Sequence, residues 1–185
     1  AADQLALSFY KSFKTPITIL RPFNTYGPRQ STRAVIPTII SQIKSSSDNL
    51  RLGKLTPTRD FNFVSDTCLA FLEISKSANV LGEIFNSCSN FEISIEKTAK
   101  LIAEIMGSSI NIVSDEKRIR PEESEVNRLF GDNSKLREIT NWQPQFGGIK
   151  GFKKGLEITV EWFTDKKNLS NYNFNKFLLW KFSLN

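Results

Sequence analysis

A short apolar strand that leads directly into a polar turn is the feature that most constrains this fold. Residues 17–20 are Ile-Thr-Ile-Leu, and residues 21–30 read Arg-Pro-Phe-Asn-Thr-Tyr-Gly-Pro-Arg-Gln. In open α/β sheets, ligands bind just outside the carboxyl ends of the strands. An asparagine, a Tyr-Gly-Pro turn and an arginine at that point therefore predict a ligand-binding rim on an α/β sheet.

Helix-like and strand-like patterns alternate along the rest of the chain. Apolar residues at helical spacing predict helices at 1–14, 35–45, 95–106 and 149–163, and another that begins at Val64. Short apolar or alternating runs predict strands at 15–20, 49–52, 59–64, 82–86 and 110–113. Residues 23–33 are expected to form a polar loop. This alternation of strands and helices indicates an α/β fold.

Residues between these runs predict how the helices begin and end. Gly107 is suited to terminate the helix at 95–106, and Asp132 or Asn133 can cap a short helix that continues to residue 139. Ser65 or Asp66 can cap the helix that begins at Val64. That helix is expected to bury one face, made of Val64, Cys68, Phe71 and Leu72.

Composition excludes several classes of function. The chain has 185 residues, a net charge of +6, two cysteines and no histidine. The positive charges are scattered, so we expect an anionic small ligand such as a diphosphate rather than nucleic acid. No run of apolar residues is long enough to predict a membrane span. Without histidine, Ser-His-Asp catalysis and the usual zinc sites are absent, and we expect no metal. Two cysteines without metal-ligand spacing suit a reduced, cytoplasmic protein.

The start of the sequence predicts that this chain is the C-terminal part of a longer enzyme. Residue 1 is alanine, and the helical pattern begins without a capping residue. The sequence contains no Gly-x-Gly-x-x-Gly motif for a dinucleotide. We therefore expect a C-terminal fragment, and a complete small domain with a processed start is the alternative.

The segment 21–29 resembles the Arg-Pro-Phe-Asn-x-Tyr-Gly-Pro-Arg segment of nucleotide-sugar epimerases and dehydratases, which belong to the extended short-chain dehydrogenase superfamily. Further motifs agree in order up to about residue 166. The resemblance implies an α/β fold, namely the C-terminal portion of a Rossmann-like fold with its smaller α/β substrate-binding domain. It assigns residues 1–34 to the end of the truncated NAD-binding domain, 35–166 mainly to the substrate domain, and 167–185 to a tail.

The resemblance also implies an NAD cofactor, a nucleotide-sugar substrate and a homodimer. The family's catalytic Tyr-x-x-x-Lys pair would lie just before residue 1, so we expect no catalytic residue within this chain and no activity from it alone. Pro22 and Phe23 resemble the segment whose backbone lies near the nicotinamide. Asn24 resembles the asparagine that hydrogen-bonds the substrate, and the alternative for Asn24 is an Asx turn.

Three further segments resemble nucleotide-binding parts of the family. Val35, Ile36 and Pro37 resemble the segment that covers the base, or they form a plain helix start with a core face. Arg59, in Gly-x-x-x-x-x-Arg-Asp-Phe, would hold the diphosphate through its planar fork of donors, unless it is a surface arginine. In Arg-Pro-Glu-Glu, Arg120 would reach the diphosphate, and Glu123 would contact the ribose where the family often has aspartate.

One segment departs from the family, and the exact activity stays open. Residues 86–90 read Asn-Ser-Cys-Ser-Asn, whereas the family commonly has Asn-x-Gly-x-Gly. Cys88 and Asn90 therefore replace the two glycines, and Asn90 tolerates a left-handed backbone. Segments 29–37 and 55–61 most resemble 4,6-dehydratases that act on UDP-N-acetylglucosamine, as in legionaminic-acid-type pathways. A 4-epimerase or a UDP-glucuronate decarboxylase is the alternative within the family. A non-catalytic module that binds sugar nucleotides or a partner is the alternative outside it.

Overall fold

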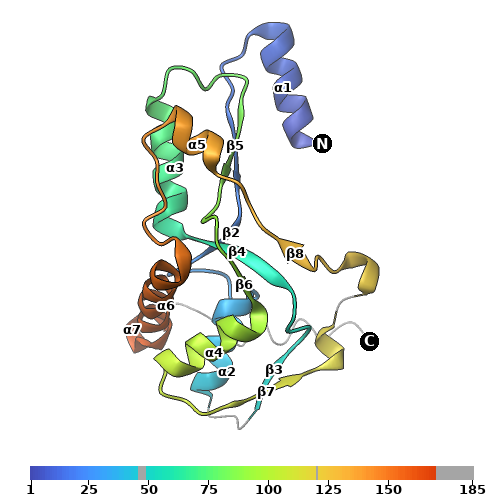
Figure 1. The fold of residues 1–185 in the computed structure, drawn as a ribbon, viewed down its shortest axis with the longest axis vertical. Coiled ribbons are helices and arrows are strands. Elements are labelled where there is room, and N and C mark those ends of the chain that lie inside the picture. Colours follow the sequence, from blue (N-terminus) through green and yellow to red (C-terminus); the bar gives the residue numbers. More distant parts are fainter. Residues whose placement is uncertain (46–48, 120, 170–185) are drawn as a thin grey trace. The chain divides into compact units, whose positions relative to one another are not determined.

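The chain divides into two compact units, each assembled from three separate segments. A computed structural model describes residues 1–45, 49–119 and 121–169 (Figure 1). The first unit comprises Ala1–Thr25, Asp60–Glu92 and Leu129–Phe152. The second unit comprises Tyr26–Arg59, Ile93–Arg128 and the chain from Lys153 onward. The assignment of residues 1–34 and 35–166 to dinucleotide and substrate domains stays a prediction.

The first unit is built on a parallel strand pair. Strands β1 (Ile19–Pro22) and β5 (Ile84–Ser87) pair with Ile19 opposite Ile84 and Pro22 opposite Ser87. Helices α3 (Val64–Lys76) and α5 (Ser134–Ile139) both contact β5 (Figure 1). The apolar core between them is contributed by Leu20, Leu69, Ala70, Ile74, Val80, Phe85, Leu136 and Trp142.

Helix α1 (Ala2–Phe13) opens the first unit and has no buried residue. Its apolar side chains are largely exposed: Leu5 by 62%, Phe9 by 46% and Phe13 by 72%. The Arg21 guanidinium on β1 pairs with Asp3, with Nη2 2.6 Å from the carboxylate. Among the helices that the structure describes, none combines the length and apolarity needed to cross a bilayer.

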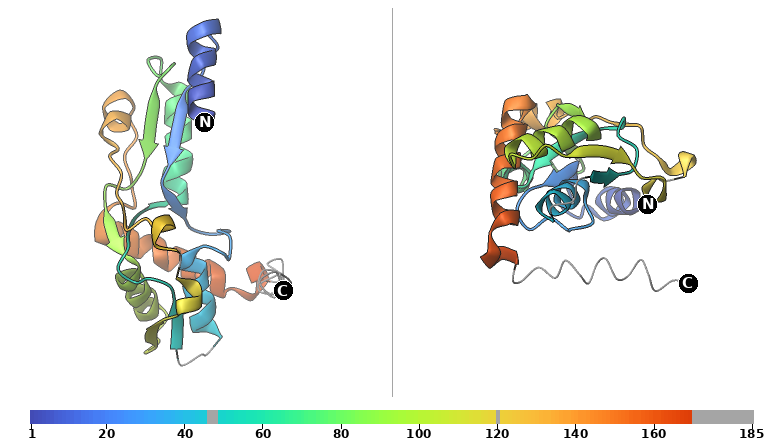
Figure 2. Two further views of the ribbon diagram at one scale, coloured as in Figure 1. Left: turned by 90° about the vertical axis from the view of Figure 1, so that its right-hand side faces the viewer. Right: turned by 90° about the horizontal axis from the view of Figure 1, so that it is seen from below.

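The second unit contains another parallel pair, β3 (Asn49–Leu52) with β7 (Asn111–Ser114). Helix α2 (Val35–Lys44) contacts both β3 and helix α4 (Ile95–Ile105), as the views in Figure 2 also show. Two 3₁₀ helices follow β7, η1 (Glu116–Arg118) and η2 (Glu122–Ser124), and the short helix α7 (Lys166–Leu169) ends the described chain. The buried residues of α2 are Ile36, Pro37, Ile39, Ile40 and Ile43.

The chain passes from one unit to the other within five elements. These are β2 (Asn24–Tyr26), β4 (Thr58–Phe63), β6 (Glu92–Ser94), β8 (Arg128–Leu129) and α6 (Gly148–Thr164). The strands among them form one sheet in the order β2-β4-β6, and β8 pairs with β4.

The predicted end of helix α4 at Gly107 is confirmed. Gly107 has φ 62°, in the left-handed region. The Ser108 N–H donates to the carbonyl of Ala103 at 2.9 Å, and the Gly107 N–H donates to that of Glu104 at 3.1 Å. These two bonds define a Schellman motif, which satisfies carbonyls that the last helical turn leaves unpaired.

The buried face of α3 differs from the predicted one. Phe71 and Leu72 are 54% and 52% exposed, whereas Asp66, Thr67, Ala70 and Ile74 are buried. On this buried side the Asp66 carboxylate accepts the backbone N–H of Phe146 at 3.0 Å, which offsets part of the cost of its burial. Neither Ser65 nor Asp66 caps α3, since its N-cap residue is Phe63 and makes no side-chain capping bond.

One strand lies at other residues than predicted, and several short strands were not predicted. The strand expected at 15–20 begins at Ile19 and continues to Pro22, because its pairing with β5 starts opposite Ile84. The polar loop expected at 23–33 contains β2, and β6 was not predicted at all. The two-residue strand β8 was also missed, and all three missed strands are too short to show a repeating pattern.

We expect Leu136→Ala to destabilise the protein strongly and Leu72→Ala to have little effect. Leu136 is completely buried beside β5, and truncating such a leucine costs about 2–5 kcal/mol. Leu72 is half exposed on a helix of the same unit, and surface changes usually stay within about 0.5 kcal/mol. Urea unfolding of both variants measures the difference, and equal losses would contradict the observed orientation of α3.

Candidate functional site

Pro22 and Phe23 lie at the carboxyl end of the β1–β5 pair. Pro22 stands opposite Ser87, and the Phe23 N–H donates to the Ser87 carbonyl at 2.9 Å. Gly131 packs closely here, because a Cβ on it would lie 2.5 Å from the Cys88 sulfur and 2.8 Å from the Phe23 ring. This is the edge at which an α/β sheet presents its ligands, so the two residues predicted to approach the cofactor occupy the expected end of the strands.

Asn24 follows directly and carries an unused hydrogen-bond donor. Its side-chain nitrogen Nδ2 is buried and has no hydrogen-bond partner among the described residues. A buried donor without a partner costs about 1–3 kcal/mol. A ligand acceptor at this position would remove that cost, and the arrangement therefore suits the predicted substrate contact.

A buried polar network supports this edge of the first unit. The Asn62 side-chain amide donates to the hydroxyls of Thr67 at 2.8 Å and Ser87 at 2.9 Å. The Thr67 hydroxyl also lies 3.2 Å from that of Thr25. These bonds tie together β4, α3 and the ends of β2 and β5, so the residues that follow β1 are held by long-range contacts.

Asp60 fastens the loop that follows β5. Its fully buried carboxylate accepts the N–H and hydroxyl of Ser89 at 2.8 and 2.7 Å, and the N–H of Gly131 at 3.4 Å. Burial is the largest influence and raises the pKa of Asp60, although the Ser89 and Gly131 hydrogen bonds act to lower it. The carboxylate anchors a loop that lacks the two family glycines.

The backbone of this loop agrees with the prediction for Asn90. Asn90 has φ 56°, whereas Cys88 does not adopt a positive φ. Burial raises the pKa of the Cys88 thiol to about 12, with the nearby Asp60 charge adding to the effect. Cys88 therefore remains a neutral thiol that packs against Gly131, in agreement with its expected lack of nucleophilic character.

Arg59, in the second unit, is paired with a carboxylate. Its Nη2 lies 3.1 Å from Glu125 Oε1, and its Nη1 donates to the Thr58 carbonyl at 2.8 Å. The two charged side chains are 15% and 9% exposed. This guanidinium is therefore largely buried and has an anionic partner, which distinguishes it from a freely exposed surface arginine.

The remaining predicted site residues of the second unit differ in accessibility. Ile36 and Pro37 lie on the buried face of α2, and Val35 in the first turn of this helix is half-buried. Glu123 is exposed on η2. Arg120 lies outside the described residues. The structure thus places Pro22, Phe23 and Asn24 together in the first unit and the other described candidates in the second, and their roles stay predictions.

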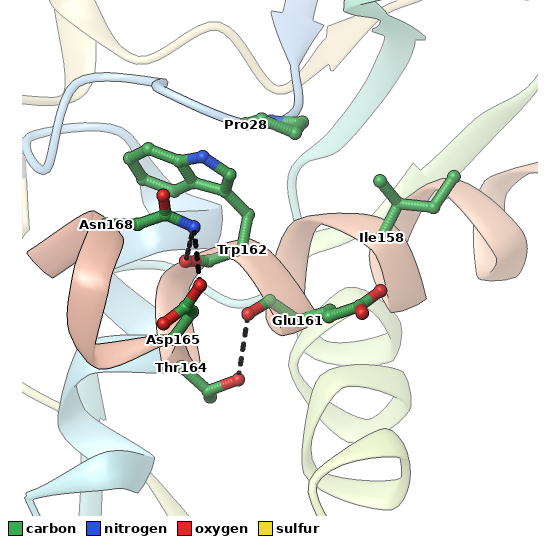
Figure 3. A pocket seen from close by; sticks show the side chains of 7 residues that line it. All are labelled: Pro28, Ile158, Glu161, Trp162, Thr164, Asp165 and Asn168. Carbon is green, nitrogen blue, oxygen red and sulfur yellow. Dashed lines mark hydrogen bonds between the residues drawn. The ribbon is translucent and has the colours of Figure 1, made fainter.

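A pocket of about 510 Å³ in the second unit is lined by none of these residues. Figure 3 shows Pro28 above the indole of Trp162. The Asn168 side chain donates to the Trp162 carbonyl at 3.2 Å. The other lining residues are Ile158, Glu161, Thr164 and Asp165.

Tyr10 and Lys14 have the Tyr-x-x-x-Lys spacing, but their position does not suit catalysis. The Tyr10 ring lies 2.1 Å from the point where a Cβ of Gly82 would stand. Gly82 precedes β5, and its N–H donates to the Ile17 carbonyl before β1 begins. The tyrosine therefore lies at the amino ends of the parallel strands, away from the carboxyl ends where ligands bind.

Known proteins share this fold and sequence pattern. The chain is 29% identical to human dTDP-D-glucose 4,6-dehydratase over 181 residues, which cover 93% of this chain and 48% of that protein. It is 33% identical to UDP-N-acetyl-alpha-D-glucosaminuronate decarboxylase of Bacillus cytotoxicus over 158 residues, 83% of this chain and 48% of that one. The chain thus spans about half the length of these relatives.

A solved structure leads to the same class of protein. The UDP-glucuronic acid 4-epimerase of Bacillus cereus, in complex with UDP-glucuronic acid and NAD, matches with a TM-score of 0.76 and 25% identity, covering 87% of this chain and 49% of that one. The fold is the Rossmann-like α/β fold of extended short-chain dehydrogenases, as the sequence predicted. The model of the GDP-mannose 4,6 dehydratase family matches residues 1–155, and the chain belongs to this family.

We expect Asp60→Asn and Asp132→Asn to change the pH dependence of stability in opposite directions. Folding raises the pKa of Asp60 through burial, so its contribution is present below the unfolded value of about 3.9 and is lost as pH rises through the folded value. Hydrogen bonds from the Ser134 hydroxyl and N–H lower the pKa of Asp132, so its contribution is lost as pH falls.

The measurement is the free energy of unfolding of each variant and the wild type between pH 3 and 6. The advantage of wild type over Asp60→Asn should shrink as pH rises, and its advantage over Asp132→Asn should shrink as pH falls. The same trend in both series would contradict the burial of Asp60.

Proposed function

We propose that the protein containing this chain is an NAD-dependent nucleotide-sugar 4,6-dehydratase and that this chain supplies most of its nucleotide-sugar site. The observation that carries the proposal is the carboxyl edge of β1 and β5. There a buried, unpartnered amide of Asn24 follows Phe23, which packs beside a glycine that admits no side chain. Because the chain belongs to the GDP-mannose 4,6 dehydratase family, we assign the binding of NAD and the sugar to this edge.

The residues at this edge fit a dinucleotide and a sugar. The backbone of Pro22 and Phe23 would lie along the nicotinamide, and the Asn24 amide would donate to an oxygen of the substrate. Bound NAD would supply the hydride acceptor for oxidation at C4 of the sugar and the hydride for C6 once water has been eliminated across C5–C6. The residues of this chain orient the sugar, while the acid–base pair of the family is expected outside it.

The second unit would hold the nucleotide. Arg59 and Arg120 would contact the diphosphate, and Glu123 the ribose. Since Ile36 and Pro37 are buried, contact with the base would come from Val35 and from the backbone at the start of α2. That start makes no side-chain capping bond at Ala34, so the N–H groups of Val35 and Ile36 lack a side-chain cap, and Pro37 has no N–H to offer.

The proposed substrate is a UDP-sugar, UDP-N-acetylglucosamine in the first instance, and the proposed assembly is a homodimer. The Bacillus cereus epimerase binds UDP-glucuronic acid and NAD, which supports both ligands for a chain of the same fold. A decarboxylase is the second candidate, because the Bacillus cytotoxicus decarboxylase has the higher identity of the two relatives compared.

Product analysis of the full-length natural protein distinguishes these functions. With NAD and UDP-N-acetylglucosamine, a dehydratase yields a 4-keto-6-deoxy sugar that has lost one water. An epimerase yields a product of unchanged mass, and a decarboxylase releases carbon dioxide from the corresponding uronate. Binding without turnover of any of them would favour a non-catalytic module.

We expect Arg59→Ala and Arg120→Ala each to weaken UDP-sugar binding about ten- to a hundredfold, the equivalent of one charge-assisted hydrogen bond. NAD affinity should not change, since neither arginine is assigned to the dinucleotide. Isothermal titration measures both affinities. Arg51→Ala, which removes the same charge from an exposed position on β3 of the same unit, is the control and should bind normally. Unaltered substrate affinity in both test variants would remove the proposed diphosphate site.

A further inference from the structure

Arg59 already has an anionic partner before any ligand is bound. Its Nη2 donates to Glu125 Oε1 at 3.1 Å, across 66 positions of sequence. Both side chains are largely buried, at 15% and 9% exposure. A buried guanidinium without a counter-ion is costly, so the Glu125 carboxylate neutralises Arg59 in the ligand-free protein.

Backbone contacts hold Glu125 beside Arg59. The Thr58 N–H donates to the carbonyl of Asn127 at 2.9 Å, which aligns the start of β4 with the segment that carries Glu125. Just before Glu125, the N–H and hydroxyl of Ser124 both donate to the Pro121 carbonyl at 3.0 Å. Because the backbone is anchored on both sides, Glu125 can leave Arg59 by rotating its side chain alone.

The pair uses little of the recognition capacity of the guanidinium. One carboxylate oxygen contacts Nη2, and Nη1 is occupied by the neighbouring Thr58 carbonyl. An arginine fork matches paired oxygens, and a diphosphate offers more oxygens and more negative charge than one carboxylate. A phosphate oxygen that binds Nη2 would compete with Glu125 for this donor.

We propose that Glu125 is a resident counter-ion that occupies the anion position of Arg59 and is displaced when a nucleotide diphosphate binds. The inference rests on the proposed function of Arg59. Each binding event then exchanges a carboxylate for a phosphate on the same guanidinium. This exchange costs affinity, because the ion pair must be broken first, and it keeps Arg59 oriented while the site is free.

The test is the affinity of the full-length protein for UDP, measured by isothermal titration. Glu125→Gln keeps the shape of the side chain but removes its charge, and should tighten UDP binding about fivefold, which corresponds to about 1 kcal/mol. In the double variant Arg59→Ala/Glu125→Gln, the substitution at Glu125 should give no gain, because the shared donor is gone.

Glu104→Gln is the matched control, since it removes one negative charge from an exposed ion pair with Lys153 in the same unit and should leave UDP affinity unchanged. Weaker or unchanged UDP binding by Glu125→Gln would overturn the inference and make Glu125 a support for Arg59 or a bystander. If wild type binds neither UDP nor another nucleoside diphosphate, the proposed function itself fails.

A second readout follows Arg59 itself, in wild type and in Glu125→Gln. In ¹⁵N spectra of the arginine side chains, the Arg59 signals of wild type should shift when UDP is added. In Glu125→Gln, the same Arg59 signals should differ before UDP and approach those of wild type at saturation. If the Arg59 signals stay unchanged on addition of UDP that is shown to bind, no exchange of partners takes place and the inference is wrong.

Discussion

The buried carboxylate of Asp60 is the interaction on which the loops at the carboxyl edge of the first unit depend. It accepts hydrogen bonds from Ser89, after β5, and from Gly131, after β8, so one side chain joins segments that are distant in sequence. The glycine then packs against Phe23 and Cys88 without space for a side chain. Burial disfavours the charged form of Asp60, and the hydrogen bonds that its carboxylate accepts offset part of this cost.

The same compromise between charge and burial recurs at Arg59 in the second unit. Desolvating a guanidinium requires a partner, and Glu125 supplies it. The proposed diphosphate site would thus contain an anion of its own, which would preserve the arrangement of donors at some cost in affinity. Asn24 differs from Arg59, because its buried side-chain nitrogen has no hydrogen-bond partner among the described residues. A ligand acceptor at this position would therefore add a hydrogen bond without breaking one.

Local chemistry explains which elements were predictable. Helix α2, strand β3 and the glycine end of α4 agree with expectation, because periodicity and the left-handed conformation of Gly107 act over a few residues. The face of α3 was predicted wrongly, because Asp66 is buried and its carboxylate has a hydrogen-bond partner, Phe146, that lies 80 positions away. Hydrophobic spacing contains no information about such a partner, and the three-residue strands carry too short a pattern.

The sequence by itself determined the class of the protein. Each motif that indicates this class, such as Arg-Pro-Phe-Asn-x-Tyr-Gly-Pro-Arg after the first strand, is made of residues that are close together in the chain. It also named Asn24 and Arg59 as candidates. The tertiary structure decided their present partners. It left the Asn24 amide without one and joined Arg59 to Glu125, one of many acidic side chains in the sequence. Long-range pairing depends on which segments the folded backbone brings together, and no local pattern of residue types specifies that choice.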